Sequence, residues 1–371
     1  MKPDLAFNLI GSKLSWSDAD FAKEFRELQL MIDHKYDGYH GFQPATRFHI
    51  ALLNWLSQFP NEEERQTAYR FVKQRMVYVS QREMHHLVSL MMPTIDRLAR
   101  KWVALELKVP VYQTHLDSAA IARLELLRRR TLYVGLSDGA RIDVFRRYNE
   151  GKVSNEQVVA FSEISDEKWA SLQEELSKDL YPGVPPPKQV PACFEAVCLV
   201  DDFSGSGSSL LRWDDKSGKW KGKIAKFYAA NHKRIGTQLV KDCVVHVHHH
   251  LASEQARLQI LGDLAKFGAE NPAFKFSASF SHVLQPGIVI GDSCSDAELV
   301  SLLTSWYDKE IEDEHTGRDI WFGYKQCGLP LVLEHNTPNN SIALLWAESA
   351  MGGTPKMKPL FARRKRHSSH G

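Results

Sequence analysis

Two adjacent acids, Asp201 and Asp202, begin the stretch of this sequence that is best suited to chemistry. They follow the apolar run 194–200 and precede a run of serine and glycine. Small residues let backbone N–H groups approach phosphate oxygens, and serine hydroxyls add further donors. The two carboxylates can hold ribose hydroxyls directly or through a hard divalent cation such as Mg²⁺. We therefore expect a ribose-phosphate or nucleotide ligand here, with Asp201 and Asp202 as catalytic and metal-binding residues. The expected phosphate-binding residues are Ser204, Gly205, Ser206, Gly207, Ser208 and Ser209.

Other polar residues follow other apolar runs. His335, Asn336, Asn339 and Asn340 come directly after the run 329–333. Asparagine-rich turns with proline are ordinary loop chemistry. Alternatively, the amides read a base and His335 moves a proton, which makes His335 a third candidate catalytic residue.

A run of histidines, His246 and His248 to His250, invites a metal-binding interpretation. Strand alternation puts His246, His248 and His250 on one face and His249 on the other. No carboxylate stands at a recognisable ligand spacing, so we favour histidines that line the sheet and end its strand. The strand end still opens toward the expected ligand, within reach of His248 or His250.

An alternation of strands and helices must position these loops. Apolar runs at 132–136, 194–200, 243–248, 274–280 and 329–333 predict strands, and 253–268 and 296–311 predict helices. This order predicts an α/β fold with a mostly parallel sheet, whose ligands bind beyond the carboxyl ends of the strands. We expect a helical region over 1–128, the α/β domain over 129–350 and a basic tail over 351–371. The polar segment 151–191 ends in prolines and predicts a mobile lid with a helix near 166–178.

The composition suits a globular protein of the cytoplasm. The chain has 371 residues, 43% of them hydrophobic, with 47 Lys and Arg against 45 Asp and Glu. The five cysteines form no Cys-x-x-Cys pair, which argues against a disulfide framework or a structural zinc site. The sequence lacks the apolar run of a signal peptide or a membrane span, so we expect no membrane partner. The tail's cations suit phosphate-rich partners such as DNA or RNA, or else simply solubilise the end. They are Lys356, Lys358, Arg363, Arg364, Lys365 and Arg366.

The segment AVCLVDDFSGSGSSLL resembles the signature of the type I phosphoribosyltransferases: a hydrophobic strand, two acids and a small-residue loop. The resemblance places Asp201 and Asp202 on the acid pair and 206–209 on the phosphate loop. The unit YVGLSDGAR is similar to the family's earlier strand and pyrophosphate-binding loop, and 151–191 takes the place of its mobile catalytic loop. The residues to which the resemblance assigns pyrophosphate binding are Ser137, Asp138, Gly139 and Arg141. Asp138 to Gly139 also suits an ordinary turn.

More narrowly, DDFSGSGSS, the aromatic and basic residues after it, and HNTPNNSIALLWAE resemble phosphoribosyltransferase-like effectors of bacterial antiphage, retron-type conflict systems. Two positions depart from the wider family. Gly205 stands where many purine-type enzymes have a further acid that contacts the base, and Asp138 stands where a backbone-only cradle is common. The departures put standard nucleobase salvage in doubt.

The resemblance implies transfer or cleavage at C1 of a ribose 5-phosphate compound, with magnesium. The implied substrate is phosphoribosyl pyrophosphate or a nucleotide, and the implied enzyme is a glycosyltransferase or a nucleotide N-glycosidase with a role in antiviral defence. The resemblance also implies a defence-complex partner, which the basic tail could bind. The alternative is a non-catalytic module that senses a nucleotide or associates with nucleic acid.

Overall fold

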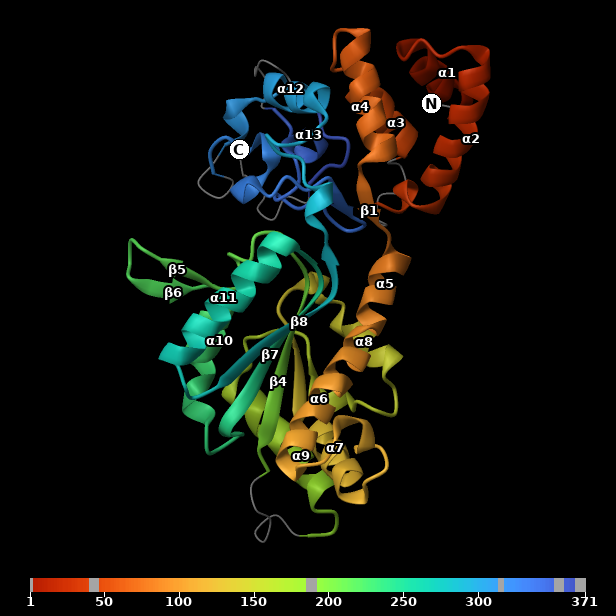
Figure 1. Cartoon of the computed structure of the whole chain (residues 1–371). Helices are drawn as coiled ribbons and strands as arrows, with labels where there is room; N and C mark the ends of the chain where they lie inside the picture. Colours follow the sequence, from red (N-terminus) through yellow and green to blue (C-terminus); the bar gives the residue numbers. More distant parts are fainter. Residues whose placement is uncertain (1–2, 40–46, 185–191, 313–316, 350–356, 364–371) are drawn as a thin grey trace. The chain divides into compact units, whose positions relative to one another are not determined.

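The computed structural model describes residues 3–39, 47–184, 192–312, 317–349 and 357–363 (Figure 1). The chain divides into two compact units. Unit 1 combines residues 1–84 with 285–371, and unit 2 consists of residues 85–284. This division differs from the expected boundaries at 128 and 350, because the helices of 85–129 pack with the α/β sheet and the chain beyond 284 returns to unit 1.

Unit 2 contains the parallel sheet that the sequence predicts. Its strand order is β3-β2-β4-β7-β8, and every neighbouring pair is parallel. The strands are β2 (Thr131–Gly135), β3 (Val158–Val159), β4 (Phe194–Ser204), β7 (Leu239–Ser253) and β8 (Lys275–Leu284). The predicted α/β fold class is confirmed. The order reverses direction between β2 and β4, and ligands of such sheets bind beyond the strand ends at this switch point.

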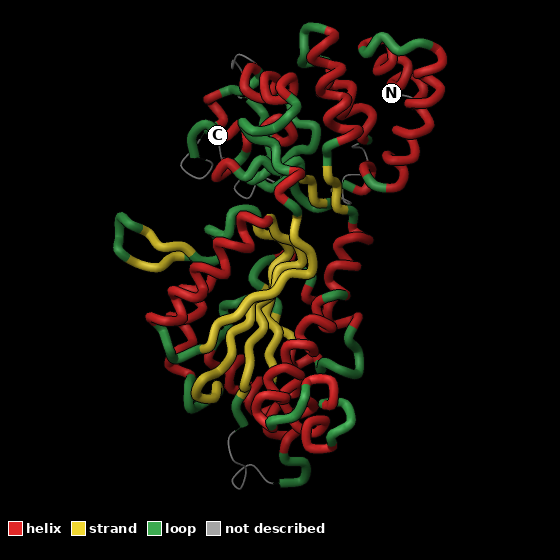
Figure 2. Tube along the Cα trace, in the orientation of Figure 1, coloured by secondary structure: helices red, strands yellow, loops and turns green. Residues whose placement is uncertain are grey.

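Helices cover both faces of the sheet (Figure 2). The pleat sends alternate residues to opposite faces. On one face, Val197 and Leu199 of β4 join a core with helices α9 (Asp166–Leu180), α10 (Lys223–Asn231) and α11 (Glu254–Glu270). On the other face, Cys198 and Val200 join a core with α5 (Gln81–Ser89), α6 (Met91–Leu107) and α8 (Ile142–Tyr148). The helix α7 (Ser118–Arg129) packs on α6 through a smaller apolar cluster.

The segment expected to be a mobile lid is built into unit 2. Helix α9 lies within it, and Trp169, Leu172 and Leu176 of that helix are buried against the sheet. The Trp169 indole N–H also donates to Asn231 Oδ1 at 3.1 Å. The part of the segment at 185–191 lies outside the described residues. Helix α9 is therefore core structure, and the expectation of a lid is wrong for this helix.

Unit 1 holds most of the remaining helices and a small parallel sheet. Its helices are α1 (Pro3–Lys13), α2 (Asp18–His34), α3 (Phe48–Leu56), α4 (Glu62–Gln74), α12 (Ala297–Ser305) and α13 (Ala343–Trp346). Strand β9 (Leu331–Leu333) pairs with β1 (Val77–Val79), although the sequence placed the run 329–333 in the main sheet. That placement is wrong, because the partner strand lies some 250 residues earlier in the chain. No helix among the described residues has the length and apolar character to cross a membrane.

The expected tail divides into a packed part and a part outside the described residues. Met357, Leu360 and Phe361 are buried in the core of unit 1. The backbone N–H groups of Leu360 and Phe361 both donate to the carbonyl of Leu345, at 2.9 and 3.0 Å. Residues 364–371, with three of the six cations, lie outside the described residues. A truncation that leaves this core intact must therefore begin after Arg363.

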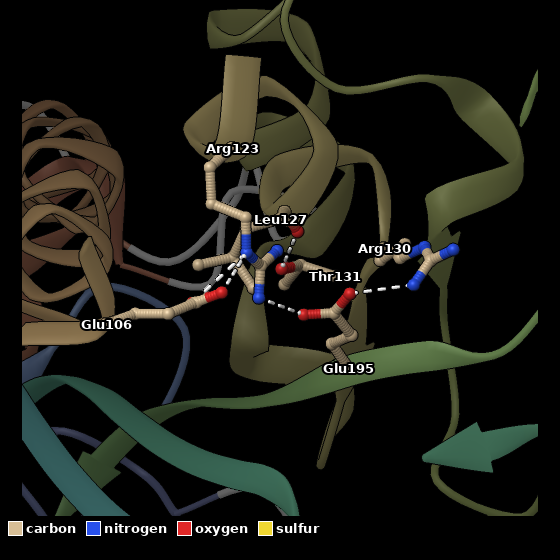
Figure 3. Close-up of polar contacts among 6 residues, drawn as sticks. All are labelled: Glu106, Arg123, Leu127, Arg130, Thr131 and Glu195. Carbon is tan, nitrogen blue, oxygen red and sulfur yellow. Dashed lines mark hydrogen bonds and ion pairs between the residues drawn. The ribbon is translucent and has the colours of Figure 1, made fainter. Parts of the chain in front are cut away.

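An ion-pair network lies at the amino end of β4 (Figure 3). Glu195 accepts hydrogen bonds from Arg123 Nη2 at 2.7 Å and from Arg130 Nη1 at 2.8 Å. The second partner of Arg123 is Glu106, at 2.9 and 3.1 Å from its Nε. The Glu195 side chain is only 15% exposed. If this carboxylate is removed, water can do little to solvate the charges of Arg123 and Arg130 that it now pairs with.

We expect Glu195→Ala to destabilise unit 2 by about 2 kcal/mol, because two partly buried guanidinium groups lose their carboxylate. Glu174→Ala is the matched control, since Glu174 pairs with Lys178 but is 68% exposed. Its removal should cost less than about 0.5 kcal/mol. Urea denaturation measures both, and equal losses in the two variants would contradict the stabilising role of the network.

Candidate functional site

The loops after β2 and β4 meet at the switch point of the sheet. The Leu136 N–H donates to the carbonyl of Val200 at 2.8 Å, which joins the two strand ends. One step further, the Ser137 hydroxyl donates to the Asp201 carboxylate at 2.5 Å. The structure thus brings together the two loops that the sequence singled out.

Asp201 and Asp202 point to opposite faces of the sheet, as neighbouring strand residues must. Asp201 is buried, and its second carboxylate oxygen pairs with Nζ of Lys223, the first residue of α10, at 2.5 Å. Burial raises the pKa of Asp201, whereas the charge of Lys223 pulls it down and that of Asp202 raises it further. Asp202 is half-buried and lies by alternation on the face of His250.

A divalent cation fits this acid pair only with further ligands. Both oxygens of Asp201 are engaged, one by Ser137 and one by Lys223, so metal binding by Asp201 requires Lys223 to move. Within the described ranges, no group of three or more His, Cys, Asp and Glu side chains could hold a metal. Mg²⁺ binding by Asp201 and Asp202, with phosphate or hydroxyl oxygens of a bound compound completing the metal's shell, therefore stays a prediction.

The loop at 205–209 presents unpaired backbone donors. Within the described part of the chain, the N–H groups of residues 206–209 donate to no protein acceptor. Gly207 adopts a φ of +78°, which glycine tolerates best, and the hydroxyls of Ser206 and Ser208 lie 2.9 Å apart. The hydroxyl of Ser253, which caps α11, donates to the carbonyl of Gly205 and fixes the loop. Successive free N–H groups in such a turn form a concavity for an anion.

A hairpin separates this loop from the next helix. A single turn at 208–210 is followed by a hairpin of β5 (Arg212–Asp214) and β6 (Lys219–Lys221), and only then by α10. The first N–H groups of α10, from Lys223 and Ile224, donate back to the carbonyls of Ser209 and Leu210 at 3.2 and 3.0 Å. The helix thus continues the turn, and the hairpin is inserted between them.

The loop after β2 offers a second set of donors. Residues Asp138–Ala140 form a single 3-10 turn. Among the described residues, the N–H groups of Asp138 and Gly139 donate to no protein acceptor. Arg141 has a φ of +50° and precedes α8. The His250 ring contacts the Ala140 carbonyl through Nε2 at 2.9 Å, which holds this loop against β7.

A match to a family model shows the family of the chain. The model of the PRTase-CE family matches residues 52–363, most of the chain. The chain belongs to the PRTase-CE family. Its members are phosphoribosyltransferase-like, so a phosphoribosyltransferase-type, transferase function is indicated. No curated protein and no solved structure gave a significant match.

In this PRTase-CE protein the residues after β9 belong to unit 1, whereas the loops after β2 and β4 belong to unit 2. His335 Nδ1 lies 3.5 Å from Oε1 of Glu334. Asn340 is buried and donates to the carbonyl of Tyr324 at 3.3 Å, and the carbonyl of Asn339 accepts from the Tyr324 N–H at 2.7 Å. Asn336 closes a tight turn with Leu333. These contacts give the segment a structural role within unit 1, and a catalytic or ligand-facing role for it stays a prediction.

Sequence reasoning missed two residues that shape the PRTase-CE site, Lys223 and Ser253, and it missed the contact that His250 makes. Lys223 stands 22 residues after its partner Asp201, beyond an inserted hairpin, and nothing in its neighbourhood signals the pairing. Ser253 stands before a predicted helix, so its cap could have been foreseen but not its bond to Gly205. His250 ends a predicted strand, yet its contact with Ala140 depends on the register of β7.

The histidine cluster of the PRTase-CE chain forms a ladder with serines of β8. His246 contacts the hydroxyls of Ser277 and Ser279 through its two ring nitrogens, at 2.8 and 2.7 Å. His248 likewise contacts Ser279 and Ser281, at 2.8 and 2.9 Å. Burial lowers the pKa of His246 to about 4 and also lowers that of His248. The favoured interpretation, histidines that line the sheet, agrees with this arrangement.

The ladder predicts a loss of stability in mild acid. Because the pKa of His246 falls from 6.5 in the unfolded chain to about 4, the unfolded state binds the proton first. The free energy of unfolding should therefore decrease as the pH falls from 6.5 towards 4, by roughly 2 kcal/mol at pH 5 from His246 alone. Urea denaturation at pH 7 and pH 5 should show a smaller decrease for His246→Gln than for the unmodified protein. His282→Gln, at an exposed position of β8, is the control and should show the same decrease as the unmodified protein. If the decrease in His282→Gln is as small as that in His246→Gln, the loss of stability does not come from His246.

Proposed function

We propose that the protein binds phosphoribosyl pyrophosphate or a nucleotide at the loops after β2 and β4 and acts at C1 of its ribose. The observation that carries this proposal is the row of free N–H groups at 206–209, at the switch point of a parallel sheet. In this assignment residues 206–209 bind the 5-phosphate, and 137–139 with Arg141 bind the pyrophosphate. Asp201 and Asp202 hold the ribose hydroxyls.

The chemistry is breakage of the bond between C1 and its leaving group. The electron pair of that bond departs with the pyrophosphate or the base, and the sugar passes through a cation-like transition state. A nucleophilic acceptor, or water in a glycosidase, then forms the new bond to C1. The chain's contribution is to hold the ribose rigidly and to place carboxylates near the developing positive charge. Bound Mg²⁺ would neutralise charge on the leaving group.

The acid pair also supports a second candidate, a nucleotide-sensing module. The carboxylate of Asp201 is paired with Lys223, so a ribose hydroxyl or a metal ion reaches that oxygen only if Lys223 moves. A ligand that displaces Lys223 moves the start of α10. That movement provides a signal without any turnover.

Release of pyrophosphate from phosphoribosyl pyrophosphate, with and without magnesium, separates these candidates. An enzyme should show magnesium-dependent release, at a rate that depends on an added acceptor or on water. Binding by calorimetry without release would support the sensing module, and neither binding nor release would refute both. For the biological role we propose antiviral defence, supported by the resemblance to antiphage effectors. Phage plating on cells with and without the gene tests it, and equal plaque numbers would count against it.

A further inference from the structure

The β5–β6 hairpin, residues 212–221, is an insertion that the fold does not require. Helix α10 already continues the turn at 208–210 through the bonds from Lys223 and Ile224. Gly222 closes the insertion with a φ of +116°, and a Cβ there would lie 2.5 Å from the Leu210 carbonyl oxygen. Figure 1 shows the hairpin projecting from the body of unit 2 beside α10 and α11. A projecting element that adds little to the core needs another explanation.

One tryptophan of the hairpin anchors it and the other is presented to solvent. Trp213 and Trp220 are paired across the two strands, with ring centroids 5.5 Å apart and planes at 74°. The Trp220 indole donates to Glu270 at 2.7 Å and packs edge-on against Phe267 of α11. Trp213 is 47% exposed. A large aromatic face held rigidly by its neighbour, yet left open, suits stacking by a planar ligand.

The hairpin carries a net positive charge, with four cations against two acids in residues 212–221. Its only acids are Asp214 and Asp215, against several cations, and Asp214 is already paired with Lys221 at 2.6 Å. Arg212 stands directly opposite Lys221, a like-charge pair that destabilises an isolated ribbon. The exposed cations of the hairpin are Arg212, Lys216, Lys219 and Lys221. A polyanion that binds between them relieves this repulsion.

The base of the hairpin is tied to the candidate phosphate loop. Arg212 Nη1 donates to the carbonyl of Ser208 at 2.9 Å. A chain of phosphates that follows the cations of the hairpin is thus led towards the loop at 206–209. An acidic peptide would pair with the cations, but its carboxylates would not stack on the exposed indole of Trp213. An unpaired base stacks on such a ring.

We propose that the β5–β6 hairpin binds single-stranded nucleic acid. A base stacks on Trp213, and the backbone passes round the turn at Lys216 to Lys219 and Arg212, which strand alternation places on the opposite face of the ribbon. The bases of a duplex are stacked on one another and leave no face for the indole, so the proposed site selects single strands. This binding does not depend on catalysis at C1 or on phosphoribosyl pyrophosphate.

Fluorescence anisotropy with a labelled oligothymidine of about 15 nucleotides tests the site on the full chain. We expect Trp213→Ala to weaken binding about tenfold or more and Trp213→Phe to restore most of it. Leu258→Ala, which removes an apolar side chain that is 57% exposed on α11, should change nothing. Replacing Lys216 and Lys219 together by Gln should lower the salt dependence by about 0.7 per lysine in the logarithmic slope.

Three outcomes would overturn the proposal. One is unchanged affinity for the oligonucleotide in Trp213→Ala. If at the same time the lysine replacement weakens binding, the hairpin attracts anions by charge alone, as a site for an acidic peptide would. Another is equal affinity for the duplex form of the same oligonucleotide. The third is a complete loss of binding in a chain truncated after Arg363, which would assign the site to the tail. Calorimetry with phosphoribosyl pyrophosphate on Trp213→Ala keeps the two proposals apart, since that binding should be unchanged.

Discussion

Gly207→Ala should weaken the binding of phosphoribosyl pyrophosphate by at least an order of magnitude. Gly207 is buried at a φ of +78°, and its new Cβ would lie 3.1 and 3.2 Å from Cβ and Cγ of Gln259. The loop must shift away from α11, and a shift disperses the row of N–H groups that converge on the phosphate. The strained backbone conformation adds about 1 kcal/mol of destabilisation. Calorimetry measures the affinity, and urea denaturation measures the stability.

Gly218→Ala is the matched control for this variant. Gly218 also has a positive φ, of +60°, but a Cβ there meets nothing within 4 Å. It therefore carries a similar backbone strain without touching the loop. Its affinity for phosphoribosyl pyrophosphate should equal that of the unmodified protein. If both variants lose affinity equally, or neither does, residues 206–209 are not the phosphate site.

Asp201→Asn should lower turnover by two orders of magnitude or more while the folded protein holds or gains stability near pH 7. The amide keeps the size of the side chain and can still accept from Lys223, but it removes the negative charge beside C1. Burial raises the pKa of Asp201 in the folded protein above its ordinary value. The stability that the protonated acid contributes is therefore present at low pH and is lost as the pH rises through the folded pKa.

The pH dependence distinguishes this electrostatic origin from a simple loss of fold. Between pH 4 and pH 8 the free energy of unfolding should fall less with rising pH in Asp201→Asn than in the unmodified protein. Asp143→Asn, which removes an exposed acid paired with Arg147, should leave the pH dependence unchanged. Full turnover in Asp201→Asn would refute the catalytic role of this acid.

Local patterns in the sequence were sufficient for β2, β4, β7 and β8 of the main sheet and for the loops after β2 and β4, but not for the short edge strand β3. The run ending at Asp201 is apolar because both faces of β4 are covered by helices, and the same holds for β2. Because the carboxyl ends of parallel strands share one edge, the amino-acid pattern alone predicts that the loops at 137–141 and 204–209 lie together. It does not predict that Ser137 and Lys223 engage Asp201, since that depends on how α10 packs.

The wrong predictions, the placement of β9 and the lid at 151–191, concern segments whose structure depends on contacts with distant parts of the chain. Strand β9 has the apolar pattern of any buried strand, and only the position of β1 decides that it lies outside the main sheet. The supposed lid is polar overall, yet Trp169, Leu172 and Leu176 recur at helical spacing and bury one face of α9. That periodicity was the available signal. The stretch 213–223 has the pattern of a charged loop or a hairpin, and the structure shows a hairpin in which Trp213 pairs with Trp220.

The structure of the protein with phosphoribosyl pyrophosphate and magnesium tests the central claim most directly. We predict the 5-phosphate within hydrogen-bond distance of the N–H groups of residues 206–209, the ribose hydroxyls at Asp201 or Asp202, and the pyrophosphate at the loop of Asp138 and Gly139. Lys223 should have moved from Asp201 wherever the metal contacts that acid. A 5-phosphate bound elsewhere, with the loop at 206–209 left empty, would contradict the account.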